Sequence, residues 1–210
     1  MWQATSNRNS KKRVGLFPGS FNPVHTGHLI IAHHLLQNTD LEEIWFLVSP
    51  QNPLKEESEL LGEKDRFEML KLAIAGQEGF VACNREFSLP RPSFTVNTLR
   101  VLGEEHPDID FALIVGNDNL EVFDKWKDYD KILETTDIYV YPRKESAKSR
   151  FSTHPRVKNF DAPLLQISSN GIRQIIAEGK TPKYLLPEKV LNSIVKKGFY
   201  NPNSSLRIST

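Results

Sequence analysis

The sequence has few cysteines, no long apolar run and little excess charge, and each of these absences excludes a class of protein. It has one cysteine, Cys83, which excludes an intrachain disulfide framework and fits a reducing compartment. No apolar run approaches the ~20 residues of a membrane-spanning helix. The net charge is only +1, so the chain lacks the bulk basic excess that a non-specific nucleic-acid binder carries. We therefore expect a cytoplasmic protein that binds neither a membrane nor nucleic acid.

The composition is that of a globular protein. The chain has 210 residues, of which 39% are hydrophobic and 25% charged. A chain of this length forms one domain and buries roughly 70% of the surface that it exposes when unfolded. Its polar, basic beginning lacks the apolar core of a signal peptide. We expect a disordered lead-in at residues 1–12, one domain at 13–198 and a tail at 199–210.

Short apolar runs alternate with segments of helical periodicity. The predicted strands are residues 13–17, 42–50, 80–83, 108–118, 137–143 and 162–168. The predicted helices are residues 26–37, 64–76, 93–106, 169–179 and 187–198, with Gly76 at one helix end and Ser93 as an N-cap. This alternation predicts an α/β fold: a doubly wound, Rossmann-like parallel sheet with helices on both faces and a small C-terminal helical segment.

Such sheets bind ligands at the carboxyl ends of their strands, where the strand order reverses. Each unusual loop of this sequence follows a predicted strand, so we expect these loops to meet at one edge. They are Pro18–His25, Ser49–Lys55, Gly116–Asp118 and Ser168–Asn170.

Four of the six histidines lie within ten residues of "GLFPGSFNPVHTGHLIIAHHLL", residues 15–36. Gly19 and Ser20 are typical of a tight turn between strand and helix, whose backbone N–H groups bind anions. The stretch matches neither the Walker loop nor the G-x-G-x-x-G fingerprint. His25 and His28 are spaced so that both rings face one ligand, and Gly27 lets that ligand approach the backbone.

Three interpretations of the histidines compete. They are ordinary surface or core residues, zinc ligands, or groups that stabilise phosphates. The first suits His33 and His34, which follow a helical apolar pattern. Zinc needs further ligands at recognisable spacing, and no second cluster stands out. Phosphate stabilisation therefore suits His25 and His28 best.

Two motifs carry a resemblance to a known superfamily. "GSFNPVHTGH" resembles the signature of the nucleotidyltransferases that share an HxGH motif with class I aminoacyl-tRNA synthetases. "ISSNGIR", residues 167–173, is similar to their second hallmark, Ser-Ser-Thr-x-Ile-Arg, with Asn170 where threonine is usual. The size of the chain and the lack of a tRNA-binding domain exclude a synthetase.

Further segments narrow the resemblance to the bacterial nicotinate mononucleotide adenylyltransferase family, and it extends from Val14 to Ile194. They are "RPSFTVNTL", "LIVGNDNL", "FDKW" and "YLLPEKVLNSI". One departure is Leu54, where many members have the histidine of Pro-Pro-His-Lys. The resemblance implies that the chain joins ATP and nicotinate mononucleotide into deamido-NAD and pyrophosphate, in NAD biosynthesis. The implied step is a direct in-line attack on the α-phosphate.

The resemblance also implies the site residues. His25, His28 and Arg173 would be catalytic. The implied ATP-binding residues are Gly19, Ser20, Phe21, His25, His28, Asp118, Ser169 and Arg173. Those implied for nicotinate mononucleotide are Lys55, Thr95 and Trp126. Mg²⁺ would be held by the ATP phosphates and water rather than by protein ligands.

Each assignment outside the histidine motif has a structural alternative. Asp118 also suits a helix N-cap, Trp126 a core aromatic beside Phe123, and Thr95 a first-turn helix residue. Lys55 and Arg173 also suit solvated surface charges.

Rival functions remain open at this stage. Phosphopantetheine adenylyltransferase and cytidylyltransferases share the phosphate motifs. A non-catalytic nucleotide-sensing protein would keep the fold without turnover, but the intact His25, His28 and Arg173 argue against it, and no basic helix-turn-helix accompanies the domain. The sequence leaves a homo-oligomer open.

Overall fold

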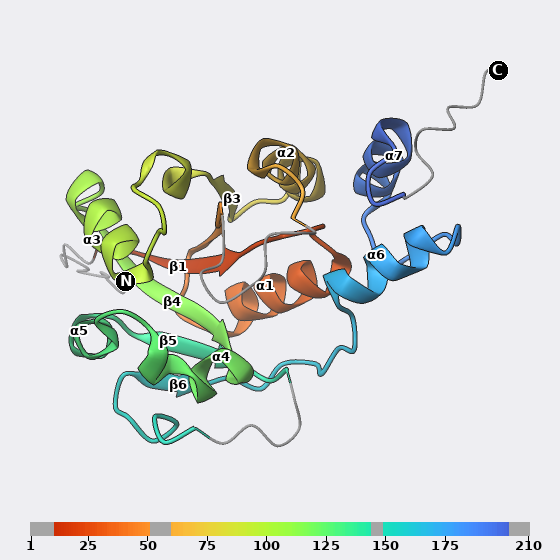
Figure 1. Cartoon of the computed structure of the whole chain (residues 1–210). Coiled ribbons are helices and arrows are strands. Elements are labelled where there is room, and N and C mark those ends of the chain that lie inside the picture. The colour runs from red at the N-terminus through yellow and green to blue at the C-terminus, as the bar shows by residue number, and fades with distance from the viewer. Residues whose placement is uncertain (1–10, 51–59, 144–148, 202–210) are drawn as a thin grey trace, which may run out of the picture.

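The structure of this protein is a computed structural model that describes residues 11–50, 60–143 and 149–201. It contains one parallel six-stranded sheet in the order β3-β2-β1-β4-β5-β6 (Figure 1). The strands are β1 (Lys12–Gly19), β2 (Glu43–Val48), β3 (Phe80–Cys83), β4 (Ile109–Gly116), β5 (Ile138–Tyr141) and β6 (Val157–Asn159). The order reverses between β1 and β4, so a ligand site is expected at the carboxyl ends of these two strands.

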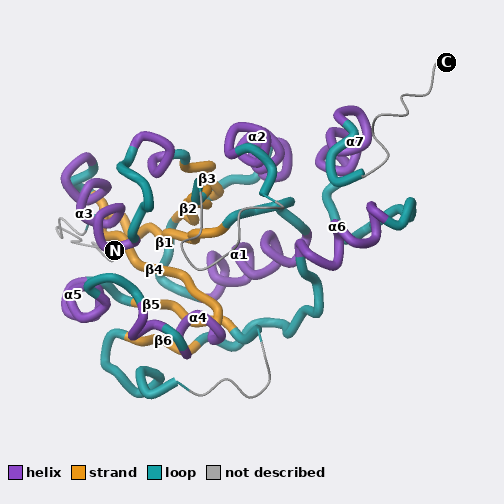
Figure 2. Tube along the Cα trace, in the orientation of Figure 1, coloured by secondary structure: helices purple, strands orange, loops and turns teal. Residues whose placement is uncertain are grey.

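Helices cover both faces of the sheet (Figures 1 and 2). They are α1 (Thr26–Asn38), α2 (Glu63–Ile74), α3 (Thr95–Glu105), α4 (Asn117–Glu121), α5 (Tyr129–Thr135), α6 (Ser169–Ala177) and α7 (Glu188–Lys197). Two short 3₁₀ turns, η2 (Arg85–Ser88) and η3 (Phe123–Lys125), precede α3 and α5. One core joins α1, α2, α6 and α7 to one face, and two smaller clusters join α3 and α5 to the other. The doubly wound α/β prediction is confirmed.

β4 illustrates why the sheet needs both layers. Ala112 and Ile114 belong to the core beneath α1 and α2, whereas Leu113 and Val115 belong to the cluster beneath α5. A continuous apolar run of this kind is typical of a parallel strand covered on both faces. Among the described helices, none has the length and apolar character needed to cross a bilayer.

The strand predicted at 162–168 is wrong. The sixth strand is β6, and the chain then runs without regular structure to α6. Pro163 has no N–H to donate to a ladder, and Leu164 is 40% exposed. The true strand escaped notice because Val157 is its only buried residue.

The other predicted elements are confirmed to within a few residues, and Gly76 follows the end of α2 with φ of 81°. α5 was not predicted. The N-cap assigned to Ser93 is wrong, because Phe94 occupies that position and the Ser93 hydroxyl donates to Glu86 instead.

Gly15 on β1 provides a test of the packing between sheet and helix layer. A Cβ there would lie 2.6 Å from Ile114 Cδ1 and 2.8 Å from Leu41 Cδ1. Gly15→Ala should lower the free energy of unfolding by about 1–3 kcal/mol, measured by urea denaturation. The matched control is Gly103→Ala on α3, where a Cβ meets nothing within 4 Å and should stabilise by about 0.5–1 kcal/mol. Equal effects of the two substitutions would contradict this packing.

Candidate active site

The turn after β1 is held in place by the side chain of Phe21. Its φ of 45° lies in the left-handed region, which costs an ordinary residue roughly 1–2 kcal/mol. Burial offsets this cost, because the ring is 2% exposed and lies 6.0 Å from the Phe17 ring and 5.0 Å from the His28 ring. A Cβ on Gly19 would lie 2.8 Å from the Phe21 ring. Glycine at this position therefore gives the ring its space.

His25 and His28 form a stacked pair at the start of α1. Their ring centroids are 3.6 Å apart, with 25° between the planes. The backbone N–H of His25 donates to His28 Nδ1 at 3.2 Å, which fixes the orientation of the second ring. A Cβ on Gly27 would lie 3.1 Å from the His25 ring. The glycine of the motif is thus needed for the ring of the first histidine.

His25 is a neutral imidazole at physiological pH. Its side chain is 5% exposed, and this burial lowers the pKa to about 4, with a further contribution from the positive charge of Arg143. Its Nδ1 is buried and makes no hydrogen bond within the described part of the chain. A buried ring nitrogen of this kind is suited to form a hydrogen bond with a ligand.

The second motif contacts the first. Ser169 Oγ donates to the carbonyl of Pro23 at 2.9 Å, and Arg173 Nη1 donates to the carbonyl of Asn22 at 3.0 Å. Ser169 does not cap α6, because Ser168 is the N-cap and accepts from the N–H of Gly171. The start of α6 therefore packs on the turn that follows β1, although 146 residues separate Pro23 from Ser169.

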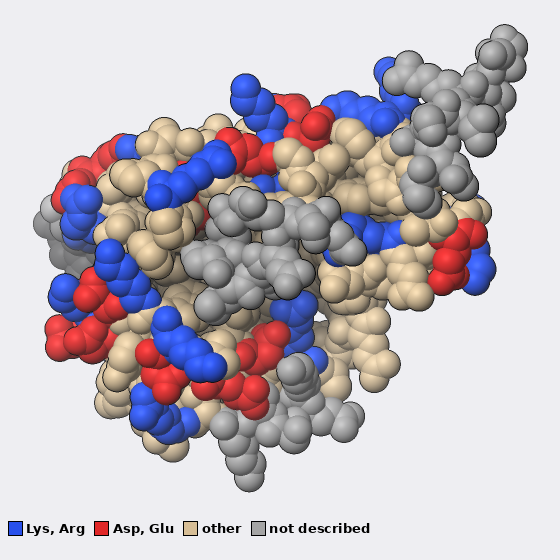
Figure 3. Space-filling model, in the orientation of Figure 1, with Lys and Arg blue, Asp and Glu red and all other residues tan. Residues whose placement is uncertain are grey.

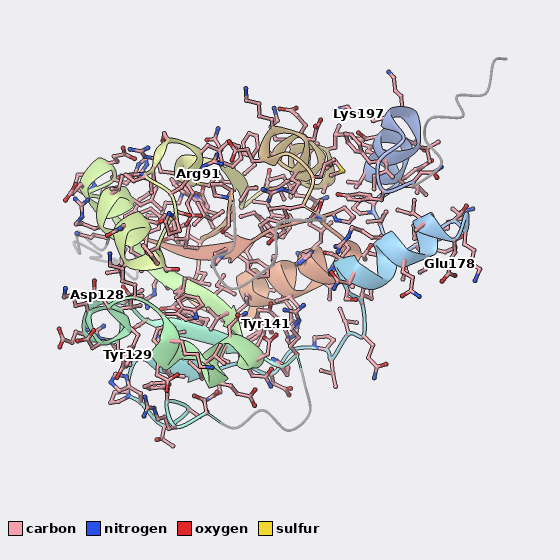
Figure 4. The ribbon with its side chains drawn as sticks, in the orientation of Figure 1. Arg91, Asp128, Tyr129, Tyr141, Glu178 and Lys197 are labelled. Atoms are coloured by element: carbon pink, nitrogen blue, oxygen red, sulfur yellow. The ribbon has the colours of Figure 1, made fainter. Side chains whose placement is uncertain are left out.

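Arg143, just after β5, is a site residue that the sequence reasoning missed. Its guanidinium lies 3.2 Å from Asp118 Oδ2, and its backbone N–H donates to Asn117 Oδ1. Tyr141, labelled in Figure 4, ends β5 beside α4 and is 7% exposed. The sequence could have indicated it, since Arg143 is the last residue of a predicted strand and so lies at the edge of the sheet where the loops meet.

Asp118 does not cap α4. The N-cap is Gly116, and Asp118 lies in the first turn, where its Oδ1 accepts from the N–H of Asn119. Its other oxygen faces Arg143, whose charge reaches His25. The loops after β1, β4 and β5 thus meet, as the sheet topology predicts.

Thr95 and Trp126 belong to a second group of segments. Thr95 is the first residue of α3, and Trp126 directly follows η3. Trp126 is half-buried, with its ring 5.1 Å from the Phe123 ring, so one side of it is a core contact. Lys127 Nζ lies 4.7 Å from the centre of the Phe94 ring, which joins the two segments. Lys55 lies outside the described residues.

Arg66, on α2, is a fully buried cation that links two of the loops. Its side chain is 0% exposed. It donates to four backbone carbonyls, those of Ser20, Ser49, Pro50 and Leu61. Sequence reasoning missed it, although it stands one helical turn before Met69 and Leu70, on the buried face of α2.

The residues after α7 also reach the site. Tyr200 Oη donates to Asn22 Oδ1 at 2.8 Å, and the N–H of Leu61 donates to the same oxygen at 3.3 Å. Burial raises the pKa of the Tyr200 phenol. Phe199 and Tyr200 both pack against the main core. The domain limits at 13–198 stay a prediction, with an ordered contact just beyond them.

The described residues form no metal-binding cluster, and the face drawn in Figure 3 carries charges of both signs. Within residues 11–50, 60–143 and 149–201, no group of three or more His, Cys, Asp and Glu side chains is arranged to hold a metal ion. On the face drawn in Figure 3, the described basic and acidic side chains are interspersed. Polar groups converge at the carboxyl edge of the sheet, and a separate ion-pair network gathers around Arg13 and Asp137 at the opposite edge.

The model of the "Cytidylyltransferase-like" family matches residues 16–205, which include both motifs. The chain belongs to this family. Among its cytidylyltransferase-like relatives, a Christiangramia forsetii protein is 48% identical over 191 residues, covering 90% of this chain and 98% of its own. A Cytophaga hutchinsonii protein is 45% identical over 189 residues, with the same coverage. Both are named "Probable nicotinate-nucleotide adenylyltransferase", and the resemblance to that group is confirmed.

Solved structures of the same fold include two of Plasmodium falciparum nicotinic acid mononucleotide adenylyltransferase. The complex with NaAD has a TM-score of 0.75 at 19% identity and covers 90% of this chain and 97% of its own. The complex with APC has a TM-score of 0.73 at 18% identity, with the same coverage. These neighbours confirm the Rossmann-like architecture of the cytidylyltransferase-like chain.

The contacts of Arg66 predict a large loss of stability when its guanidinium is removed. Arg66→Met leaves four buried or half-buried carbonyls without their donor and should lower the free energy of unfolding by about 3 kcal/mol. The control is Arg100→Met on α3, whose exposed side chain pairs with Glu104 and should change stability by less than about 0.5 kcal/mol. Urea denaturation of both variants measures the difference, and similar midpoints would contradict the linking role of Arg66.

The lowered pKa of His25 predicts a pH dependence of stability. Between about pH 6.5 and pH 4 the unfolded chain takes up a proton at His25 that the folded chain does not, so stability falls as the pH falls through this window. The contribution reaches about 3 kcal/mol at the lower end. Urea denaturation at several pH values should show a steeper loss in the wild type than in His25→Gln. Parallel profiles would contradict the burial of a neutral ring.

Proposed function

We propose that this chain transfers the adenylyl group of ATP to nicotinate mononucleotide and releases deamido-NAD and pyrophosphate. The observation that carries the proposal is the contact of the α6 start with the turn after β1, through Arg173 to Asn22 and Ser169 to Pro23. It brings both nucleotidyltransferase motifs to the switch point of the sheet. The names of the relatives at 45–48% identity support the same reaction.

The proposed chemistry is one in-line displacement. A phosphate oxygen of the mononucleotide forms a bond to the α-phosphorus of ATP, and the bond from that phosphorus to the bridging oxygen of the β-phosphate breaks. Pyrophosphate leaves with the electron pair of that bond. No covalent intermediate is required, so the protein contributes positioning and stabilisation of the developing charge.

The roles of the ATP-side residues follow from their placement. We assign the α-phosphate to His28 and nearby phosphate oxygens to the neutral ring of His25, whose Nδ1 lacks a partner in the described chain. The backbone N–H groups of residues 19–21 would face the phosphates. Arg173 would hold the β- and γ-phosphates, since a guanidinium suits paired oxygen contacts. Asp118 would meet the ribose hydroxyls or the adenine.

Mg²⁺ would enter with the substrate. As a hard cation it prefers phosphate oxygens and water, and the triphosphate supplies these ligands. When bound, it neutralises charge on the phosphates. The role of Arg173 and the histidines is then to hold the remaining oxygens.

The mononucleotide would occupy the side of the site formed by the start of α3 and the segment around Trp126. The ring of Trp126 offers a surface for the pyridine, and Thr95 borders the same side. The N–H groups of Lys125 and Trp126 already donate to the carbonyls of Val122 and Phe123. The other backbone N–H groups of residues 124–129 would satisfy both oxygens of a carboxylate but would oppose the NH₂ of an amide. This favours the nicotinate over the nicotinamide form. We assign the substrate phosphate to Lys55 on the basis of the family motif alone.

We also propose that the protein works in the cytoplasm with these two nucleotides as its partners. The single cysteine supports a reducing compartment. Phosphopantetheine adenylyltransferase is the alternative activity from the same superfamily, and the names of the relatives argue against it.

The test is pyrophosphate release from ATP with a panel of acceptors: nicotinate mononucleotide, nicotinamide mononucleotide and phosphopantetheine. We expect the highest kcat/KM for nicotinate mononucleotide, by roughly ten- to two-hundred-fold over the amide. Equal values would contradict the specificity, and activity with phosphopantetheine alone would contradict the substrate class.

Two histidine variants distinguish the activity of this chain from that of a contaminating enzyme. His28→Ala should lower kcat by about 10²–10³-fold, because it removes a group that stabilises the transition state. His33→Ala, on the same helix but exposed, should leave kcat unchanged. If both variants release pyrophosphate with the wild-type kcat, His28 has no role in the mechanism.

A further inference from the structure

Glu86 is a buried carboxylate that the adenylyl transfer itself does not use. It lies on η2, directly after β3, and is 3% exposed. It forms no ion pair within the described residues, and burial raises the pKa of its carboxyl group. A buried acid without a cation is unfavourable unless hydrogen bonds satisfy it. Its hydrogen-bond partners therefore indicate what the residue is for.

Two hydroxyl groups donate to this carboxylate. Ser93 Oγ donates to one oxygen and Thr98 Oγ1 to the other, both at 2.9 Å. The side chain of Ser49 lowers the pKa of the same carboxyl group. Since an ionised carboxylate only accepts, it fixes the direction of the two donated hydroxyls. Glu86 thus connects the end of β2 to the start of α3.

Among the described residues, no side chain caps the start of α3. Phe94 is the N-cap residue, and its side chain cannot accept a hydrogen bond from the first turn. Ser93 and Thr98, which Glu86 holds, flank Phe94 and Thr95 on either side. The position of Thr95 therefore depends on the carboxylate behind it.

The same turn is held on its other side by the Trp126 segment. Lys127 Nζ lies over the Phe94 ring at 4.7 Å from its centre, a cation–π contact. Because Lys127 follows Trp126 directly, a shift of Phe94 also moves the backbone next to Trp126. Glu86 thus acts on the two described residues that the sequence assigns to the mononucleotide, Thr95 and Trp126.

We propose that Glu86 is a positioning residue for the mononucleotide half of the site. It acts through Ser93 and Thr98 and does not touch the substrate. The proposal rests on the adenylyl transfer proposed above. The ATP half is held by separate contacts, from Ser169 and Arg173 to the turn after β1. Loss of the hydrogen bonds to Glu86 should therefore weaken the binding of the mononucleotide and leave the binding of ATP unchanged.

Steady-state kinetics of Glu86→Ala and Thr98→Val test this split. Thr98→Val keeps the shape of the side chain and removes only the hydroxyl. We expect KM for nicotinate mononucleotide to rise roughly tenfold in both, while KM for ATP and kcat stay within about twofold. Thr98→Ser, which restores the hydroxyl, should restore the wild-type KM.

The matched control is Glu105→Ala. Glu105 pairs with Arg85, the neighbour of Glu86, but on the exposed surface, and its loss should leave both KM values unchanged. A merely structural role of Glu86 would reduce the folded fraction, which lowers kcat per total protein without changing either KM. An unchanged mononucleotide KM in both variants, or an equal rise in both KM values, overturns the proposal.

The outcome is separable from that of the proposed function. If the wild type uses a different mononucleotide, the proposed substrate is wrong. The effect of the Glu86 variants on the KM for that other mononucleotide then still tests the role of Glu86. If the wild type releases no pyrophosphate from ATP with any of the mononucleotides tested, both proposals are wrong.

Discussion

The carboxyl edge of the sheet depends on the buried guanidinium of Arg66. The loops after β1 and β2 leave the sheet side by side, and their buried carbonyls need hydrogen-bond donors. Arg66 supplies them to Ser20, Ser49 and Pro50 at once. Burial disfavours its charge and lowers its pKa, but four carbonyl dipoles point their negative ends at it. An arginine meets this demand because it carries five donors in a planar fork.

This arrangement also sets the direction of the turn that would face the phosphates. The carbonyl of Ser20 points inward to Arg66. A peptide group is planar and trans, so the N–H of Phe21 points the opposite way, out of the loop. The strained φ of Phe21 and the start of α6 on Asn22 then hold the turn from both sides. One buried cation thus gives the backbone the polarity that an anion site requires.

Local chemistry explains which features the sequence alone could predict. The apolar runs of β1 and β4 bury both faces, and that pattern is visible without coordinates. The motif residues lie in turns whose composition is diagnostic. Arg66 and Glu86 could not be assigned, because their partners are backbone carbonyls and hydroxyls up to 46 residues away. β6 escaped for the opposite reason: at the edge of the sheet only Val157 is buried, so the strand has no apolar pattern. The run at 162–168 has such a pattern, although Ala162 is its only fully buried residue.

Ser49 lies between the two buried charges. Its carbonyl accepts from Arg66, which also holds the turn after β1. Its side chain lowers the pKa of Glu86, which holds the start of α3. The carbonyl thus faces a buried cation, and the hydroxyl favours a buried anion. Serine provides both from one residue, whereas alanine would keep only the carbonyl bond. The buried charges of Arg66 and Glu86 therefore do not neutralise each other directly. They act through a neutral residue between them, and each keeps its own loop in place.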